Sequence, residues 1–183
     1  MARVLIPLAD GCEELEAVTI IDLLRRGGLE VVTAGLSHRG ANGAHGIAIG
    51  ADTTLDAVAK AEFDAVVLPG GEPGGTHLKE DPRVLALLKR HAAAGKLVAA
   101  ICAAPSALAA AGLLDGKLAT SYPGYLDDHP APGMRFVSQP VVVDGRIVTS
   151  RGPGTAMDFA LVLIEMLLGR AARDKVEAPL MRS

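Results

Sequence analysis

The chain has 183 residues and a net charge of −3, half of its residues are hydrophobic, and only 3% are aromatic. This length suits one domain over residues 1–183 with a core of Ala, Val, Leu and Ile, and the lack of basic runs argues against a specific nucleic-acid site. No apolar run reaches the roughly 18 residues of a membrane helix and no signal-peptide pattern is present, so we expect a cytoplasmic protein without membrane contact.

Short apolar runs alternate with helical patterns along the chain. Strands are expected at residues 3–8, 29–34, 47–49, 64–68 and 96–101, and an Asp-Gly turn predicts a β-hairpin over 141–148. Helices are expected at 13–26, 55–61, 82–94, 103–111, 155–168 and 171–176. The alternation predicts an α/β fold with a mostly parallel sheet and helices on both faces. Ligands bind beyond the carboxyl ends of such strands, which confines the site to segments 9–16, 69–76, 102–105 and 150–155.

Cys102 is expected on a tight turn between a buried strand and the following helix. The residues two before and two after it, Ala100 and Ala104, are small, as such a nucleophile turn requires. Pro105 suits the first turn of a helix. The N–H groups at the helix start favour a thiolate, so the pattern predicts a reactive cysteine with a lowered pKa. The alternative is a small buried cysteine without chemistry.

Two glycines, Gly70 and Gly71, follow the neighbouring buried strand. Glycine lets backbone N–H groups approach a bound group closely, so the N–H groups of Gly71 and Ala103 are candidates for an oxyanion hole. The alternative is an ordinary tight turn. The stretch lacks the Gly-Lys-Ser/Thr ending of a phosphate loop and does not match G-x-G-x-x-G.

Glutamates at the start of the first helix are candidates for proton transfer. Glu13 shares a face with apolar residues, Glu16 lies one turn before Ile20, and Glu14 is expected to point to water. A carboxylate at a helix start usually complements the helix dipole only. One buried beside a thiol would have a raised pKa and could donate to a thiolate or shuttle a proton. The spacing does not choose between Glu13 and Glu16.

Several stretches together carry a family resemblance over essentially the whole chain. They are residues 13–18, 22–28, 67–71, 99–105, 149–155 and 178–180. In them the chain resembles the DJ-1 branch of the ThiJ/PfpI superfamily, close to its bacterial YajL-type members. The resemblance implies a flavodoxin-like three-layer sandwich, a homodimer, and a site without cofactor or metal. It also implies that Cys102 is the reactive cysteine and that Glu16 is the carboxyl group hydrogen-bonded to it.

The resemblance also assigns the residues around this pair. It places Gly71 and Ala103 at the oxyanion hole, and it places at the pocket Gly70, Arg26, Tyr122, Gly152 and Pro153. Tyr122 stands where some members have histidine, and a tyrosine is a poor base at neutral pH, which leaves Glu16 to move protons alone. Peptidase-like members have histidine directly after the nucleophile, and Ala103 at that position argues against peptidase activity.

The remaining histidines and the second cysteine have no assigned role. We expect the histidines on the surface or in loops, with His45 or His77 nearest the pocket, and none shows ligand spacing: His38, His45, His77, His91 and His129. Cys12 is expected to be a partly buried small residue, the alternative being an auxiliary redox thiol.

The resemblance implies a cofactor-independent enzyme that acts on reactive dicarbonyls. Family members convert methylglyoxal and glyoxal to hydroxy acids and remove early glycation adducts, so we expect a glyoxalase III or deglycase-like enzyme whose substrates are small dicarbonyls or glycated protein groups. The alternative is an oxidative-stress redox sensor or chaperone in which Cys102 oxidises to sulfinic acid. Both functions use the same residues, so the sequence does not separate them.

Overall fold

The computed structural model describes residues 1–182. In this range the strands are β1 (Arg3–Leu8), β2 (Glu30–Gly35), β3 (Gly40–Asn42), β4 (Ala48–Gly50), β5 (Thr53–Thr54), β6 (Ala65–Leu68), β7 (Leu97–Ile101), β8 (Leu118–Ala119), β9 (Arg135–Phe136), β10 (Val141–Asp144) and β11 (Ile147–Ser150). The helices are α1 (Glu14–Arg26), α2 (Leu55–Val58), α3 (Gly74–Glu80), α4 (Pro82–Ala93), α5 (Pro105–Ala110), α6 (Ala156–Leu168) and α7 (Arg170–Glu177), with short 3-10 helices at Pro153–Thr155 and Ala178–Leu180. None of these helices is long and apolar enough to cross a bilayer.

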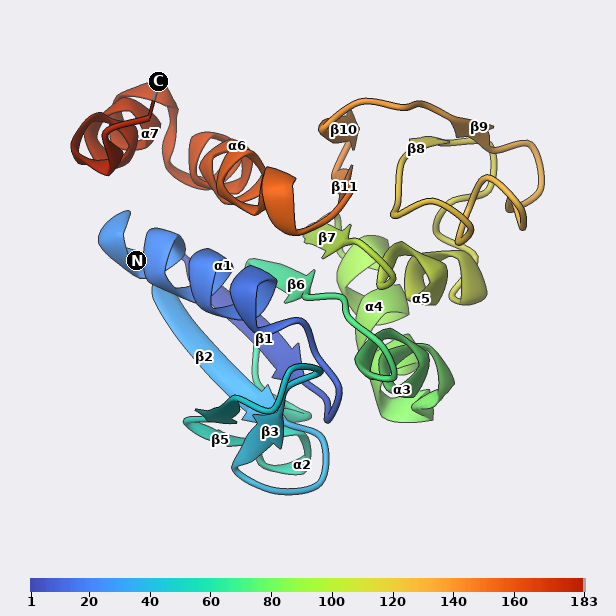
Figure 1. The fold of residues 1–183 in the computed structure, drawn as a ribbon, viewed down its shortest axis with the longest axis horizontal. Coiled ribbons are helices and arrows are strands. Elements are labelled where there is room, and N and C mark those ends of the chain that lie inside the picture. Colours follow the sequence, from blue (N-terminus) through green and yellow to red (C-terminus); the bar gives the residue numbers. More distant parts are fainter. Residues whose placement is uncertain (183) are drawn as a thin grey trace.

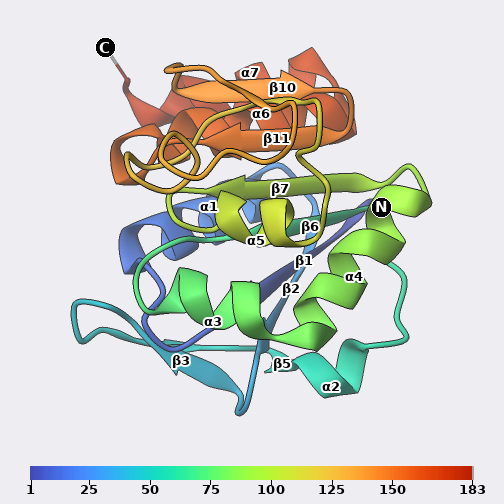
Figure 2. The ribbon, with the colours of Figure 1, turned by 90° about the vertical axis from the view of Figure 1, so that its right-hand side faces the viewer.

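The main sheet holds its strands in the order β10-β11-β7-β6-β1-β2-β5. β10 and β11 form an antiparallel hairpin, and every other neighbouring pair of this sheet is parallel. Figures 1 and 2 show α1 and α6 on one face of the sheet and α4 and α5 on the other. The predicted α/β class, with a mostly parallel sheet between two helical layers and a hairpin, is confirmed.

Alternate residues of the central strands pack on opposite faces of the sheet. Val4 and Ile6 of β1 belong to the core cluster that contains residues of α1 and α6. Leu5, between them, belongs to the cluster with residues of α4 and α5. All three side chains are fully buried. Strands covered on both faces read as continuous apolar runs, which is why β1 was recognisable in the sequence.

The structure contains four short strands, β3, β5, β8 and β9, and one helix, α3, that the sequence did not predict. The polar stretch 37–43 contains β3, which pairs with β4 as a small antiparallel hairpin. α3 begins with two glycines, which are weak helix formers, and it is held in place by the fully buried Leu78. The helix expected from residue 103 begins at Pro105, because residues 102–104 form the turn itself.

Candidate active site

The carboxyl ends of β1, β6, β7 and β11 bring the predicted site segments together at one edge of the sheet. The N–H of Glu13, at the start of α1, donates to the Gly70 carbonyl at 2.9 Å. The N–H of Cys102 donates to the Ser150 carbonyl at 3.0 Å, which ties the cysteine turn to the end of β11. These bonds join the segments in two pairs, and the parallel pairing of β6 with β7 connects the two pairs.

Cys102 stands on a backbone conformation that residues other than glycine rarely adopt. Its φ is +65°, in the left-handed region, which costs a non-glycine residue about 1–2 kcal/mol. Its side chain lies among buried residues and the residue is 8% exposed. Ala100 and Ala104 are fully buried on either side of the turn, so larger side chains there would need space that the core does not have.

Glu16 is the carboxylate beside the Cys102 thiol. It is fully buried, and its Oε2 accepts the Gly70 N–H at 2.8 Å. A Cβ on Gly70 would lie 2.6 Å from the Cβ of Cys102 and 2.9 Å from Oε2 of Glu16, so the two side chains are neighbours. Its Oε1 has no hydrogen-bond partner among residues 1–182. Glu13 instead accepts the Leu15 N–H at 3.3 Å and caps α1. The structure thus places Glu16, and not Glu13, beside the sulfur.

Burial sets the protonation of this pair. It raises the pKa of Glu16 from 4.5 to about 7, although the hydrogen bonds from Gly70 and Cys102 act in the opposite direction. It also raises the pKa of the Cys102 thiol to about 12, and the charge of ionised Glu16 raises it further. The lowered thiol pKa expected from the sequence is therefore wrong for the state with Glu16 ionised. The pattern showed the helix start but neither the burial nor the neighbouring negative charge.

Two backbone donors oppose the rise in the pKa of the Cys102 thiol. The N–H groups of Gly71 and Ala103 donate toward the Cys102 sulfur and lower its pKa. Gly71 has a φ of +90°, and a Cβ there would lie 2.2 Å from the backbone nitrogen of Glu13. The residue that presents this N–H must therefore be glycine. These are the two N–H groups that the sequence predicted as an oxyanion hole, and both face the Cys102 sulfur.

Gly70 packs against the cysteine more tightly than any side chain would allow. A Cβ on Gly70 would lie 2.6 Å from the Cβ of Cys102 and 2.7 Å from the Ile101 carbonyl oxygen. We predict that Gly70→Ala lowers the free energy of unfolding by about 1–3 kcal/mol, because backbone atoms must shift. Urea denaturation measures this, with Gly50→Ala as the control, since nothing lies within 4 Å of a Cβ at Gly50. Equal stability of the two variants would contradict the packing described.

The raised pKa of Glu16 predicts a pH-dependent stability. A carboxyl group whose pKa rises from 4.5 to about 7 on folding stabilises the protein below pH 4.5, and this contribution is lost as the pH rises through 7. The loss amounts to about 3 kcal/mol. Relative to Glu16→Gln, which has no titrating group, the wild-type free energy of unfolding should fall by this amount between pH 4 and pH 8. Denaturant titrations of both proteins measure it, and parallel pH curves would refute the raised pKa.

Of the other predicted pocket residues, three lie near the cysteine turn and one does not. The Tyr122 N–H donates to the Cys102 carbonyl at 2.9 Å, and the Tyr122 ring lies beside Gly152, which is followed by Pro153. Arg26 ends α1, where its Nε bonds Asp22 at 2.7 Å. The ten residues from Glu16 to Arg26 span about 15 Å of helix, so Arg26 does not line this pocket within one chain. The expectation that it does is wrong for the single chain.

A tyrosine that the sequence did not single out also faces this region. The Tyr125 hydroxyl donates to Glu72 at 2.8 Å. Burial and then this contact with Glu72 raise the pKa of Tyr125, and a negative charge on Cys102 adds a smaller rise. Tyr125 packs edge-to-face with Tyr122, their ring centroids 6.5 Å apart. Tyr125 and Glu72 line a cleft of about 330 Å³ that also includes Ser106. Tyr125 and Glu72 are 53 residues apart in loops, and no spacing pattern predicts their contact.

Cys12 and Glu14 occupy a second polar cluster beside the start of α1. Cys12 is fully buried rather than partly buried, and burial, with Glu14 as the next cause, raises the pKa of its thiol to about 11. Glu14 does not point to water as expected. It is 4% exposed and accepts the backbone N–H groups of His45 and Ile47 at 2.6 and 3.3 Å. These bonds anchor the loop between β3 and β4.

The same cluster is where a metal ion would find ligands. Glu13, Glu14 and His45 bring potential ligand atoms within 4.8 Å of one another. His45 Nδ1 already lies 3.0 Å from Glu14 and 3.4 Å from Glu13, so the histidine interacts with both carboxylates.

Comparisons with known proteins agree on one family. The profile of the DJ-1/PfpI family matches residues 2–166. Protein DJ-1 homologs A and B of Arabidopsis thaliana are 46% and 45% identical over 180 residues, 97% of this chain. The chain spans about half the length of these relatives, 46% and 41%.

In two further comparisons the match covers nearly the full length of this chain and of the protein compared with it. The structure of oxidized Toxoplasma gondii DJ-1 superposes with a TM-score of 0.95 at 42% identity, over 100% of both chains. The glutathione-independent glyoxalase DJR-1.2 of Caenorhabditis elegans is 37% identical over 179 residues, 98% of this chain and 95% of that protein.

Proposed function

The chain belongs to the DJ-1/PfpI family, and from this premise we propose that it is a cofactor-independent glyoxalase that converts methylglyoxal and glyoxal to hydroxy acids. The observation that carries the proposal is the Cys102–Glu16 pair, a thiol and a buried carboxyl group that lie next to each other and shift each other's pKa. A relative of nearly the same length bears the name glutathione-independent glyoxalase, which supports the same chemistry.

The first step is formation of the nucleophile by proton transfer within the pair. Because burial brings the pKa of Glu16 to about 7, its carboxylate is a much stronger base than an ordinary glutamate and can take the thiol proton. Protonated Glu16 no longer repels the thiolate and can donate a hydrogen bond to it. The N–H groups of Gly71 and Ala103 then stabilise the negative sulfur.

The remaining steps convert the dicarbonyl without a cofactor. The Cys102 thiolate adds to the aldehyde carbon, the carbonyl oxygen gains a proton, and a hemithioacetal forms. Glu16 removes the proton from that carbon and returns it to the adjacent carbon, through an enediol, so that the former aldehyde carbon becomes a thioester and the neighbouring ketone a hydroxyl. Water then hydrolyses the thioester, which releases the hydroxy acid and restores the thiol. The substrate is oxidised at one carbon and reduced at the next, so no external oxidant is needed.

The proposal is tested by incubating the purified, cofactor-free protein with methylglyoxal. Proton NMR should show lactate formed in equal amount to the methylglyoxal consumed, without added glutathione. A parallel incubation with an early methylglyoxal adduct of a protected lysine or arginine asks whether the enzyme also acts on glycated groups. The absence of any lactate above the protein-free rate would overturn the glyoxalase proposal.

A redox role is the second candidate, and the different exposure of the two thiols favours it. Cys102 is 8% exposed and Cys12 is fully buried, and the free Oε1 of Glu16 offers an acidic partner for a sulfinate. We predict that mild peroxide adds two oxygen atoms to Cys102 before it modifies Cys12. Peptide mass spectrometry over time measures the order, and equal rates at both cysteines would count against a sensor.

We also propose that the chain forms a homodimer through the outer side of α1. Leu15 and Val18 are 55% and 51% exposed there, and Ile47, in the loop anchored by Glu14, is 59% exposed. Large apolar side chains gathered on one surface are typical of an interface. Light scattering should give twice the mass of the chain, and Val18→Asp should shift it to the monomer; a wild-type monomer at micromolar concentration would contradict the proposal.

A further inference from the structure

A second cavity lies at the opposite end of the sheet from Cys102. It measures about 300 Å³ and is formed by the loop before β6, residues 60–63, and by the carboxyl-terminal end of α4. Phe63, which is 2% exposed, lies in its wall, and the Arg3 guanidinium covers that ring at 4.8 Å from its centroid. The cavity is thus built on ordered groups, and no step of the proposed mechanism uses it.

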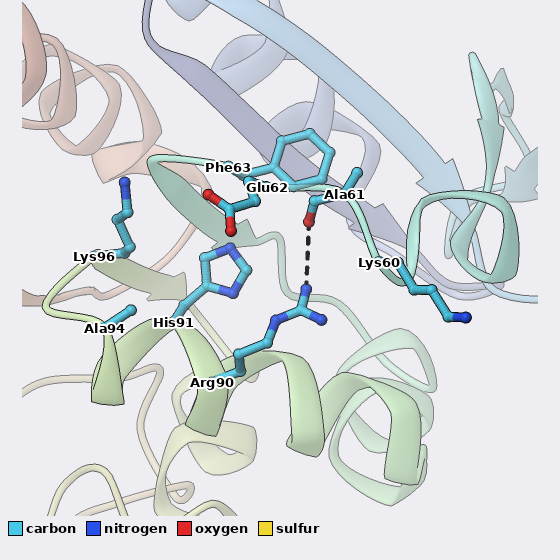
Figure 3. A pocket seen from close by; sticks show the side chains of 8 residues that line it. All are labelled: Lys60, Ala61, Glu62, Phe63, Arg90, His91, Ala94 and Lys96. Atoms are coloured by element: carbon cyan, nitrogen blue, oxygen red, sulfur yellow. Dashed lines mark hydrogen bonds between the residues drawn. The ribbon is translucent and has the colours of Figure 1, made fainter.

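A buried histidine supplies a hydrogen-bond acceptor in this cavity. His91 is only 4% exposed, and its Nδ1 bonds the Leu87 carbonyl at 2.9 Å. A carbonyl accepts only, so Nδ1 carries the proton and the other ring nitrogen, Nε2, has a lone pair in the neutral ring. Nε2 makes no hydrogen bond with any residue of 1–182. Burial lowers the pKa of His91, which keeps the ring neutral. Figure 3 shows the ring rising from α4 toward Glu62.

Two cations flank this acceptor. Arg90, which precedes His91 on α4, and Lys96 both line this cavity. Burial is the main cause of the lowered pKa of His91, and the charges of Arg90 and Lys96 lower it further. Arg90 donates to the Ala59 and Ala61 carbonyls at 2.7 and 3.4 Å and keeps further N–H donors. Lys96 bonds Asp64 at 3.0 Å and likewise keeps donors. The cavity therefore presents an uncharged acceptor, two cations with unused donors, and one carboxylate, Glu62.

We propose that this cavity binds a small carboxylate that carries a hydrogen-bond donor on its α-carbon, that is, an α-hydroxy or α-amino acid. The hydroxyl or ammonium group donates to His91 Nε2, and the carboxylate lies between Arg90 and Lys96. A plain carboxylate makes no hydrogen bond with Nε2, and a plain alcohol has no charge to interact with the cations. An ammonium group gains additional attraction from the Glu62 carboxylate because it is positively charged. A hydroxyl group has no charge and gains no such attraction.

The test is calorimetric titration of the intact protein with lactate, alanine and propionate at pH 7 and low salt. Lactate or alanine should bind at least about tenfold more tightly than propionate, which has the carboxylate without the donor. Comparison of lactate with alanine tells whether the hydroxy or the amino acid is the ligand. Equal affinity for all three, or no binding by any, overturns the proposal.

Substitutions of cavity residues test whether the ligand binds in this cavity. His91→Phe should weaken it about tenfold, and Lys96→Met, which leaves the α4 core untouched, should weaken it several-fold. Lys89→Met is the control, because Lys89 lies on α4 outside the cavity. The titration is repeated in Cys102→Ser, where unchanged binding separates this cavity from the active site. Affinity that drops in Cys102→Ser but not in Lys96→Met would refute the second site, whether or not the protein proves to be a glyoxalase.

Discussion

Cys102→Ser is expected to lower methylglyoxal turnover by a factor of about 10³ or more. A serine hydroxyl holds its proton far more strongly than a thiol does, and a carboxylate with a pKa of about 7 cannot remove it. The substitution changes one atom of similar size, so the fold and the bonds of Gly70, Gly71 and Ala103 should persist. Initial rates of lactate formation measure the loss.

Cys12→Ser provides the matched control for this experiment. Cys12 is the other buried thiol of the chain, and its neighbour Glu14, whose pKa is lowered to about 2, is too weak a base to take its proton. Its variant should retain turnover within a few-fold of the wild type, provided that circular dichroism shows it folded. If turnover survives in Cys102→Ser, or disappears equally in both variants, Cys102 is not the specific nucleophile of the proposed mechanism.

Glu16→Gln is expected to lower the same rate by about 10²–10⁴-fold. The amide oxygen can still accept the Gly70 N–H, so the pocket geometry is kept, but the side chain can no longer take the thiol proton or move one between substrate carbons. The result separates proton transfer from packing, because the variant should be at least as stable as the wild type at pH 8.

The pH profile gives this prediction a second measurement. In the wild type, kcat/KM should fall about tenfold per pH unit below 7, because protonated Glu16 cannot accept the thiol proton. In Glu16→Gln this inflection should be absent, and the small remaining rate should rise only as the thiol ionises directly at high pH. A wild-type profile that is flat between pH 5 and pH 8 would show that Glu16 is not the base.

The sequence predicted the fold and the cysteine turn because both depend on patterns of residues that are close together in the chain. β1 and β7 are continuous apolar runs, and Ala100 and Ala104 bracket Cys102 at the spacing that a tight turn needs. The choice between Glu13 and Glu16 was open because it depends on how α1 lies over the Gly70 turn. Nothing within one helix specifies that contact.

The misjudged ionisations have the same origin. The pKa of Cys102 is set by burial and by Glu16, both consequences of tertiary packing. His91, expected at the surface, was recoverable from the sequence. It follows Val84, Leu87 and Leu88 at helical spacing on the buried face of α4, a pattern that favours a core position over a loop. Tyr125 and Glu72 meet across two loops and carry no such pattern.

The left-handed backbone at Cys102 bears on which residues can occupy this position. Its cost of about 1–2 kcal/mol is a noticeable part of the 5–15 kcal/mol by which domains are usually stable. Glycine would adopt this φ without that cost, so selection for thermal robustness alone would favour glycine here. A cysteine in this conformation marks a trade-off between durability and reactivity, and thermostabilising engineering of this chain should leave position 102 alone.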